Sequence, residues 1–497
     1  MIGAIVKKFS NLKDNVWPFS RIDFKKILPL LLIKFLASLI YTILTNMKDT
    51  LNITAKGAGA EIILVLKGWV VLPIAMIVAV IFSKLSGYYS KKKVFYIMLS
   101  GFLGVIALYG FLFYPFQDFF LPHASADKLT AHFGHKYEHW ISVYRNWIHA
   151  ILFVTAELWA SVMILLLFWG LANDVSTVAE ARKSYNIYIA AGDIAAFSGG
   201  MLIWRITTWL RPVSFIYTVE TLIILVLAAG LSIMAIYRYM EKNVLTDSQR
   251  AIIHTPTKNA KKERITLRES IRHLLRSRYL LGIAVLVISY GLCISLVEVT
   301  WKESVRVLFP KSADYQAFTS RVQSMVGLFA FLISAFFGSA IIHRIGWRLS
   351  AQITPFLVGI SGFVFLAAVY LQQNWASFLH IDTISFLTVI VFFGAFQNVA
   401  SKVCKYSFFD PTKEMAFIPL DQQSKTLGKA AIDVVGSRLG KSGASWIQII
   451  FLDLIGNGSI FSIVHILMPI VFIATVSWMR SVRTLSHEFE EARTEKL

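Results

Sequence analysis

The sequence contains few charged residues and almost no cysteine. Of its 497 residues only 16% are Asp, Glu, Lys or Arg, and its mean hydropathy is +0.62. Because a soluble domain carries about 25% charged residues, this composition excludes a soluble globular, disordered or fibrous protein. The two cysteines, Cys293 and Cys404, lie in or beside apolar stretches, which argues against a disulfide framework or a zinc site. Residues 1–26 are polar and basic, so we expect no cleavable signal peptide.

The apolar residues gather in stretches long enough to cross a membrane. A helix needs about 20 mostly apolar residues to span a hydrocarbon core of about 30 Å. The sequence predicts twelve such helices, near residues 27–46, 62–83, 94–116, 148–172, 186–204, 214–237, 280–300, 322–342, 350–372, 384–402, 431–452 and 459–480. The expected fold class is therefore an all-α membrane protein.

Basic residues outnumber acidic residues by 49 to 29, giving a net charge of +20. In a soluble protein this excess would suggest nucleic acid, but in a multi-pass membrane protein it arises from cytoplasmic loops. With both termini inside, 34 Lys and Arg residues fall in cytoplasmic segments and 11 in external loops. We therefore expect cytoplasmic amino and carboxyl ends and no nucleic-acid partner.

A polar, basic connection divides the predicted helices into six and six. The expected organisation is a cytoplasmic segment (1–26), a six-helix bundle (27–237), a cytoplasmic linker (238–279), a second six-helix bundle (280–480) and a cytoplasmic tail (481–497).

Three short matches relate corresponding helices of the two bundles. Lys48-Asp49-Thr50-Leu51 matches Lys302-Glu303-Ser304-Val305, Phe168-Trp169-Gly170 matches Phe392-Phe393-Gly394, and Ala190 to Ile194 matches Ala430 to Val434. Their consistent order indicates a parallel repeat, the plan of major facilitator transporters, with a substrate site between the halves near the midplane.

Ionisable residues inside the apolar stretches are the candidate site residues. A charge at the centre of a span costs roughly 2.5–3.5 kcal/mol on insertion scales, so it should face a wet cavity or a partner. The set comprises Lys34, Lys67, Glu157, Asp193, Glu298, Asp433, Arg438 and Lys441, with Lys48 and Lys302 near span ends.

Two carboxylates in this set have two interpretations each. Glu157 either binds a proton, a lysine or the substrate, or it joins helices through a structural salt bridge. Glu298 lies four residues before Lys302, a helical spacing that allows an ion pair between them.

The segment Gly436 to Gly443 combines small residues with two cations. Its spacing does not fit a phosphate-binding loop, which needs four residues between its two glycines and a preceding strand. Arg438 and Lys441 lie three residues apart, hence on one helix face, and two such cations would clamp a phosphate chain. The alternative is close helix packing through the glycines.

The segment 402–429 mixes charged and aromatic residues. It predicts either an amphipathic helix that couples the halves or a gate closed by salt bridges of Asp410, Lys413, Glu414 and Asp421. A solvated loop is the simpler alternative. Taken together, the many cations favour an organic anion as substrate, especially a phosphate ester, over a neutral sugar or a cationic drug.

Almost the whole chain resembles the ATP/ADP translocase family of nucleotide transporters, known from obligate intracellular bacteria and plastids. The motifs that carry the resemblance are Ala156-Glu157-Leu158-Trp159, Phe168 to Asn173, Leu296 to Lys302, Asp410 to Asp421 and Arg438 to Gly443. The resemblance implies transport by alternating access, with neither enzymatic activity nor a cofactor or metal. It also implies a bacterial inner membrane.

Motif matching carries four residues needed for transport in the family onto Lys48, Glu157, Glu298 and Lys441. The implied roles are phosphate binding for the two lysines and partner binding or coupling for the two glutamates. Asn173 and Arg438 join the expected substrate-binding set from neighbouring motif positions.

One departure from the family pattern bears on the coupling mode. Typical ATP/ADP exchangers carry an Arg-Asp pair where this chain has Thr45-Asn46, so the charge balance for strict exchange is altered. The sequence is closer to family members that import nucleoside triphosphates (ATP, GTP, UTP, CTP) together with protons. The alternatives are ATP/ADP exchange and transport of another phosphorylated organic anion.

A membrane-embedded enzyme, such as a lipid phosphotransferase, is the competing interpretation from another class. It depends on His123, His132, His135 and His139 in the loop after the third predicted helix. His135 and His139 have a helical metal-ligand spacing, but no accompanying carboxylate motif supports a metal. We expect an exposed external loop without metal.

Overall fold

The computed structural model describes residues 21–256, 272, 274–336, 338–375, 382–420, 428–429, 432, 436–455 and 457–494. These residues are almost entirely helical, with one isolated β-bridge between Ser90 and Pro256. Within them, eleven helical segments are long and apolar enough to cross a membrane. The predicted eleventh span, near 431–452, lies partly outside the described residues, as does Asp433.

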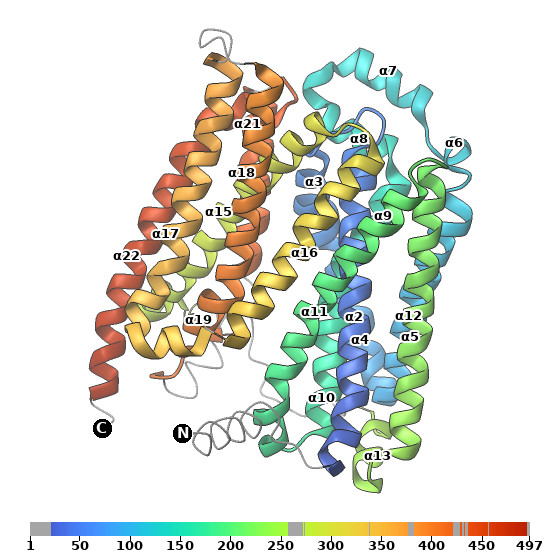
Figure 1. The fold of residues 1–497 in the computed structure, drawn as a ribbon, viewed down its shortest axis with the longest axis vertical. Coiled ribbons are helices and arrows are strands. Elements are labelled where there is room, and N and C mark those ends of the chain that lie inside the picture. The colour runs from blue at the N-terminus through green and yellow to red at the C-terminus, as the bar shows by residue number, and fades with distance from the viewer. Residues whose placement is uncertain are drawn as a thin grey trace, which may run out of the picture.

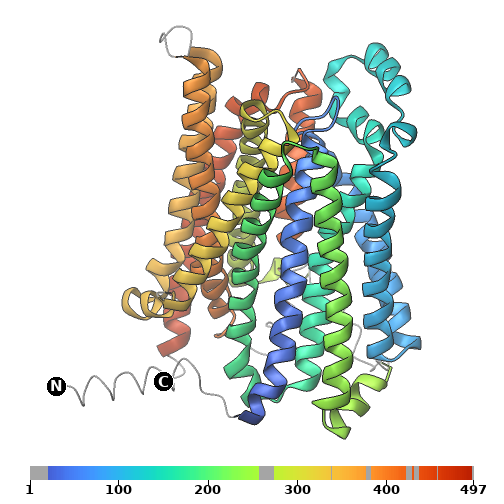
Figure 2. The same cartoon turned by 45° about the vertical axis from the view of Figure 1, so that its right-hand side comes forward.

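The helices form two halves that lie side by side (Figures 1 and 2). The amino-terminal half contains α2 (Arg21–Ile53), α3 (Ile62–Val65), η1 (Leu66–Val70), α4 (Val71–Tyr88), α5 (Lys91–Leu108), η2 (Tyr109–Phe113), α6 (Gln117–Phe120), α7 (His123–Phe133), η3 (His135–Tyr137), α8 (Glu138–Arg145), α9 (Trp147–Trp159), η4 (Ala160–Phe168), α10 (Trp169–Val175), α11 (Val178–Leu210), α12 (Phe215–Asn243) and α13 (Asp247–His254). The carboxyl-terminal half contains α15 (Arg278–Leu308), α16 (Ser312–Phe336), α17 (Gly338–Trp375), α18 (Thr383–Cys404), η5 (Lys405–Phe409), α19 (Asp410–Ala416), α21 (Ser437–Leu454), η7 (Ile460–Ile463) and α22 (Val464–Thr494).

We call the end of the molecule that carries α7 and α8 the α8 end, and the opposite end, which carries α13, the α13 end (Figure 1).

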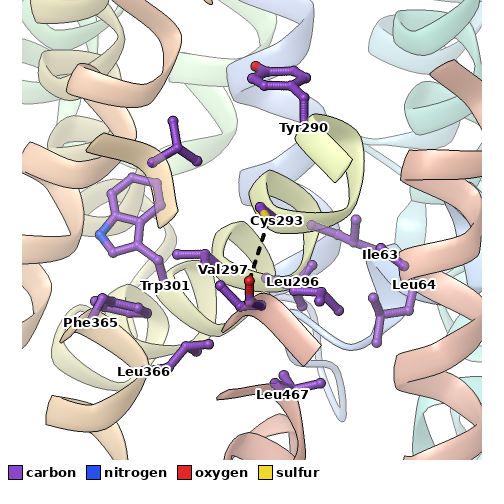
Figure 3. Close-up of a cluster of buried hydrophobic side chains, with 14 of the residues drawn as sticks. Ile63, Leu64, Tyr290, Cys293, Leu296, Val297, Trp301, Phe365, Leu366 and Leu467 are labelled. Carbon is purple, nitrogen blue, oxygen red and sulfur yellow. Dashed lines mark hydrogen bonds between the residues drawn. The ribbon is translucent and has the colours of Figure 1, made fainter. Parts of the chain in front are cut away.

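Each half has its own hydrophobic core. In the amino-terminal half, Trp159 is fully buried and its indole N–H donates to the carbonyl of Ala37, 2.9 Å away. In the carboxyl-terminal half, Trp301 of α15 is 4% exposed and donates in the same way to the carbonyl of Val391, at 3.1 Å. Figure 3 shows the surroundings of Trp301, with Phe365 beside it. Satisfying the one polar atom of each ring lets these large side chains anchor long helices inside an apolar core.

Three membrane helices contain π-helical segments close to ionisable residues. Lys67 lies within η1, Glu157 lies three residues before η4, and Lys405 begins η5. A π-helical segment widens the turn and is found mostly at functional sites. In this chain these segments lie next to charges that must avoid lipid.

The structure differs from the sequence-based expectation in two places. The tenth span continues beyond residue 402 through η5 and α19, so the candidate span runs from Thr383 to Ala416. The segment 405–416 thus continues directly from α18 as η5 and α19. The loop after the third span folds into α6, α7, η3 and α8, which cover the α8 end.

Candidate functional site

Six charged side chains form a chain of ion pairs between the two halves. In the amino-terminal half, Lys48 of α2 binds Glu157 of α9 at 3.0 Å and its neighbour Asp49 at 2.9 Å. The other oxygen of Asp49 binds Lys302 of α15 at 2.9 Å. Lys302 also binds Glu298, at 3.0 Å, as their four-residue spacing predicts.

The chain of ion pairs ends on the second helix of the amino-terminal half. There Lys67 of η1 approaches Glu298 of α15 to 3.7 Å. We call these residues the charge network; its members are Glu157, Lys48, Asp49, Lys302, Glu298 and Lys67. Positive and negative charges alternate along these ion pairs, so the six side chains carry no net formal charge and each ion faces an opposite one. A further cation, Lys402, lines the pocket beside Asp49, Glu298 and Lys302.

The side chains of the charge network differ in their exposure to solvent. The side chains of Lys48 and Lys302 are 3% and 7% exposed, whereas that of Glu157 is 32% exposed. The ammonium group of Lys48 also lies 3.9 Å from the centre of the Phe153 ring. Lys48 and Lys302 are thus covered by protein, whereas Lys67 is 22% exposed, and Glu157 is the member most accessible to a ligand or a proton.

The structure brings four of the predicted site residues together. Lys48, Glu157 and Glu298 belong to the charge network, and Lys441 of α21 lies within electrostatic reach of Glu157 and Glu298. Unlike Lys48, Lys441 is exposed. A phosphate could therefore meet Lys441 directly, but it reaches Lys48 only by displacing a carboxylate.

Two predicted site residues lie apart from the charge network. Asn173 is exposed on α10 at the α13 end, where its side-chain oxygen accepts a hydrogen bond from Tyr185. Arg438 is exposed on the first turn of α21, one turn before Lys441. Gly440 of the same helix packs on Gly291 of α15: a Cβ added to Gly440 would meet the Cα of Gly291 at 3.1 Å. Gly440 therefore serves helix packing, whereas Gly443 has no neighbour at this distance among the described residues, and the two cations are exposed.

Sequence reasoning did not place Asp49 in the site. Asp49 follows Lys48 at the end of the predicted first span, where a Lys-Asp pair is expected at the membrane surface. The signal was its place in the repeated motif that Lys302-Glu303 also carries. Only the folded structure shows that Asp49 bridges Lys48 and Lys302 across 253 residues of sequence.

A small polar pocket of about 60 Å³ adjoins Asp49 and Lys302. Its lining includes Thr45, Asn46 and Tyr315. The hydroxyl of Tyr315 and the side-chain oxygen of Asn46 are buried and have no hydrogen-bond partner among the described residues, although the Asn46 amide N–H donates to Thr319 at 3.0 Å. The pocket thus offers polar groups that the present conformation does not use.

At the α8 end two carboxylates join the halves reciprocally. Glu61, which precedes α3, accepts a hydrogen bond from the backbone N–H of Ile460 at 2.6 Å. Glu303 of α15 accepts one from the backbone N–H of Ala60 at 2.8 Å and also binds Arg306. Burial, together with the negative charge of Glu303, raises the pKa of Glu61 to about 8. These hydrogen bonds join the two halves at the α8 end through two buried carboxylates.

Three salt bridges occur among the described residues of the segment 402–429, and two of the predicted gate residues pair with each other. Lys413 binds Glu414 at 3.3 Å, Lys405 binds Asp410 at 2.7 Å, and Lys429 binds Glu414 at 2.5 Å. All three pairs lie within the carboxyl-terminal half, and the gate stays a prediction. Asp421 lies outside the described residues.

The histidines of the 123–139 loop have separate partners. His135 contacts Glu138 at 2.9 Å, and His139 contacts Asp453 of α21 at 3.1 Å. Among the residues described here, no group of three metal-ligating side chains is found.

Comparison with known proteins gives long matches. A family model described as "TLC ATP/ADP transporter" matches residues 3–489. "ADP,ATP carrier protein 1" of Chlamydia trachomatis serovar D is 38% identical, over 100% of this chain and 94% of the carrier. "ADP,ATP carrier protein 1, chloroplastic" of Arabidopsis thaliana is 34% identical, over 95% of this chain and 75% of that protein. "ADP,ATP carrier protein 3" of Rickettsia bellii is 32% identical, over 97% and 98%.

Solved structures share the fold at low sequence identity. A bacterial homologue of the iron transporter ferroportin matches with a TM-score of 0.58 and 13% identity, over 93% of this chain and 98% of that chain. A POT family transporter matches with a TM-score of 0.56 and 10% identity, over 92% and 96%. The expected major facilitator-like arrangement of membrane helices is thus confirmed.

Proposed function

The chain belongs to the TLC ATP/ADP transporter family and is a multi-pass membrane transporter of nucleotides and not an enzyme, and from that premise we propose that it imports nucleoside triphosphates together with protons. Transport would proceed by alternating access, with the two halves moving about the charge network. We place the protein in a bacterial inner membrane with the α13 end in the cytoplasm.

The neutrality of the charge network is the observation that carries this proposal. A transporter that delivers net nucleotide must return empty, and the ions at its centre must then be compensated without substrate. Three lysines and three carboxylates provide this compensation within the protein.

Binding of a nucleoside triphosphate would add several negative charges to a neutral network. The exposed cation of Lys441 offsets part of this charge. Protonation of Glu157, the most exposed carboxylate of the charge network, removes one further negative charge. The proton would therefore be taken up with the substrate, because it makes the substrate's charge easier to accommodate.

Uptake into proteoliposomes tests the coupling mode. With no nucleotide inside and an inward proton gradient, labelled ATP should accumulate, and a protonophore should abolish the accumulation. Competition by GTP, UTP and CTP would define the base preference. Uptake that needs internal ADP and ignores the protonophore would refute net import.

ATP/ADP exchange is the second candidate, because the relatives carry the name "ADP,ATP carrier protein". The same vesicles decide between the two modes. Exchange predicts uptake only when ADP or ATP is present inside.

A further inference from the structure

We propose that Asp49 is an internal competitor for the substrate's phosphate groups: it holds Lys48 and Lys302 in the empty transporter and releases them when a nucleotide binds. This inference rests on the proposed nucleotide substrate but not on the coupling mode. It assigns a role to a residue that lies outside the expected substrate-binding set.

The position of Asp49 between two ammonium groups is the first argument. One carboxylate oxygen lies 2.9 Å from the Nζ of Lys48 and the other lies 2.9 Å from the Nζ of Lys302. A phosphate group also offers several anionic oxygens to ammonium donors at such distances. Asp49 thus occupies the place that a phosphate would take between these two lysines.

The burial of the lysines explains why a substitute anion is needed. With exposures of 3% and 7%, both ammonium groups are removed from water. An unpaired cation in such a place is strongly destabilising. Each lysine also keeps a second carboxylate, Glu157 or Glu298, so displacement of Asp49 alone leaves neither ion without a partner.

The polar pocket beside Asp49 supplies a place for the displaced carboxylate. Its volume of about 60 Å³ adjoins the side chain, which is 13% exposed. The buried hydroxyl of Tyr315 lines this pocket and is an electrostatic neighbour of Asp49, and it has no hydrogen-bond partner within the described part of the chain. It would donate a hydrogen bond to Asp49 once the lysines have turned to the phosphate.

The exchange of partners also links binding to movement. Asp49 lies on α2 and Lys302 on α15, so their ion pair holds the two halves together. When a phosphate replaces Asp49, the connection between the halves passes through the substrate. When the transporter changes conformation, its two halves would then be joined by different contacts in the occupied form and in the empty form.

The Asp49→Asn variant tests the competition directly. It keeps the size of the side chain and removes its charge, so nucleotide no longer has to displace an anion. We expect purified, membrane-extracted protein to bind ATP more tightly by on the order of tenfold, the lower range measured for close charge pairs. Where the wild type shows net uptake, the variant should lose it and keep exchange, because the charge network of its empty form has three lysines against two carboxylates.

The control is Asp453→Asn. Asp453 also joins the halves, through His139 and Trp140 at the α8 end, but it contacts neither lysine. Its loss should leave ATP affinity unchanged. A purely structural role for Asp49 predicts weaker ATP binding in Asp49→Asn, and equal or weaker binding overturns the proposal.

Tyr315→Phe provides a second test that does not depend on the folding of Asp49→Asn. Loss of the hydroxyl removes the donor for the displaced carboxylate, so ATP binding should weaken by on the order of tenfold. In the Asp49→Asn background the same change should have no effect, and unchanged affinity in the wild-type background overturns the proposal. If the wild type binds no nucleotide, the proposed function fails instead, so the two failures are distinguishable.

Discussion

Glu157 differs from the other carboxylates of the charge network in having one ion-pair contact. It binds Lys48 at 3.0 Å, whereas Asp49 bridges Lys48 and Lys302, and Glu298 faces Lys302 and Lys67. Neutralising a carboxylate that bridges two lysines removes an ion-pair partner from both of them, whereas protonating Glu157 removes one from Lys48 alone. Glu157 is therefore the member that can take up a proton with the least loss of compensation.

The Glu157→Gln variant should uncouple transport from protons. The amide mimics the protonated acid, so binding and exchange should persist, while the ratio of uptake with and without a proton gradient falls to about one because no proton can be taken up. Labelled ATP uptake into proteoliposomes measures this ratio. Glu220→Gln, which alters a membrane glutamate on α12 outside the charge network, should behave like the wild type. Retained proton dependence in Glu157→Gln would assign the proton to another group.

The Lys441→Ala variant should reduce ATP affinity by tenfold or more, on the order expected for loss of a direct charge contact. The protein should still insert normally, because Lys441 is exposed and its helix packs through Gly440. Binding of labelled ATP to purified protein measures the effect, and Lys441→Arg should retain much of the affinity. Arg438→Ala is the matched control one turn away. Equal losses in both alanine variants would indicate general attraction by the helix face and not a contact with Lys441.

At the residue scale, what the sequence could predict depends on solvation cost. Glu157 and Glu298 stand out because a charge in an apolar run needs a partner or a cavity. Asp49 does not stand out, because a charge at the end of a predicted span lies near the membrane surface and costs little free energy there. Asn173, which was added from a neighbouring motif position, lies at the α13 end, apart from the charge network, so its role in substrate binding stays a prediction.

At the scale of elements, the positions of the membrane helices follow from hydropathy, but their ends do not. The tenth span was expected to end at residue 402, where lysines begin, yet it continues to Ala416. Lys405 lies within this continuous helical segment and binds Asp410, one helical turn further on, at 2.7 Å. A hydropathy window counts each charge separately and cannot see that two of them cancel.

The contacts between η7, α15 and the turn before α3 predict a pH-dependent closure at the α8 end. The groups that face Glu61 are Glu303 and Arg306 of α15 and, around the adjoining pocket, His135, Glu138 and His139. In the closed arrangement the pKa of Glu61 is raised from its ordinary value of 4.5 to about 8, so closing takes up a proton. The stabilisation of the closed arrangement is complete at acidic pH and is lost progressively as the pH rises through 8.

Spin labels on the two halves measure this closure. With labels at exposed His132 and Leu454, we expect the distance to lengthen between pH 6 and pH 9 in the wild type. Glu61→Gln should keep the short distance at every pH, because the amide oxygen still accepts the Ile460 hydrogen bond without a charge to repel Glu303. Glu138→Gln changes a glutamate of the same pocket that does not bind the other half, and it should follow the wild type. A pH-independent distance in the wild type would contradict the closure mechanism.

At the scale of the whole molecule, the charge network and the contacts at the α8 end connect the two halves at neighbouring points. Lys302, which binds Asp49, and Glu303, which accepts a hydrogen bond from Ala60, are consecutive residues of α15. A substrate that displaces Asp49 would therefore act one residue away from the contacts at the α8 end. We expect substrate binding and closure to influence each other for this reason.

The orientation of the molecule in the membrane can be tested with its own cysteines as background. Cys293 and Cys404 are both buried, so they should react poorly with a membrane-impermeant maleimide. Ser125 of α7 at the α8 end and Ser248 of α13 at the other end are exposed. In intact cells we expect Ser125→Cys to be labelled and Ser248→Cys to be labelled only after permeabilisation, since basic residues favour the cytoplasmic side. The reverse pattern would place the α8 end in the cytoplasm, and the proton taken up on closing would then come from inside the cell.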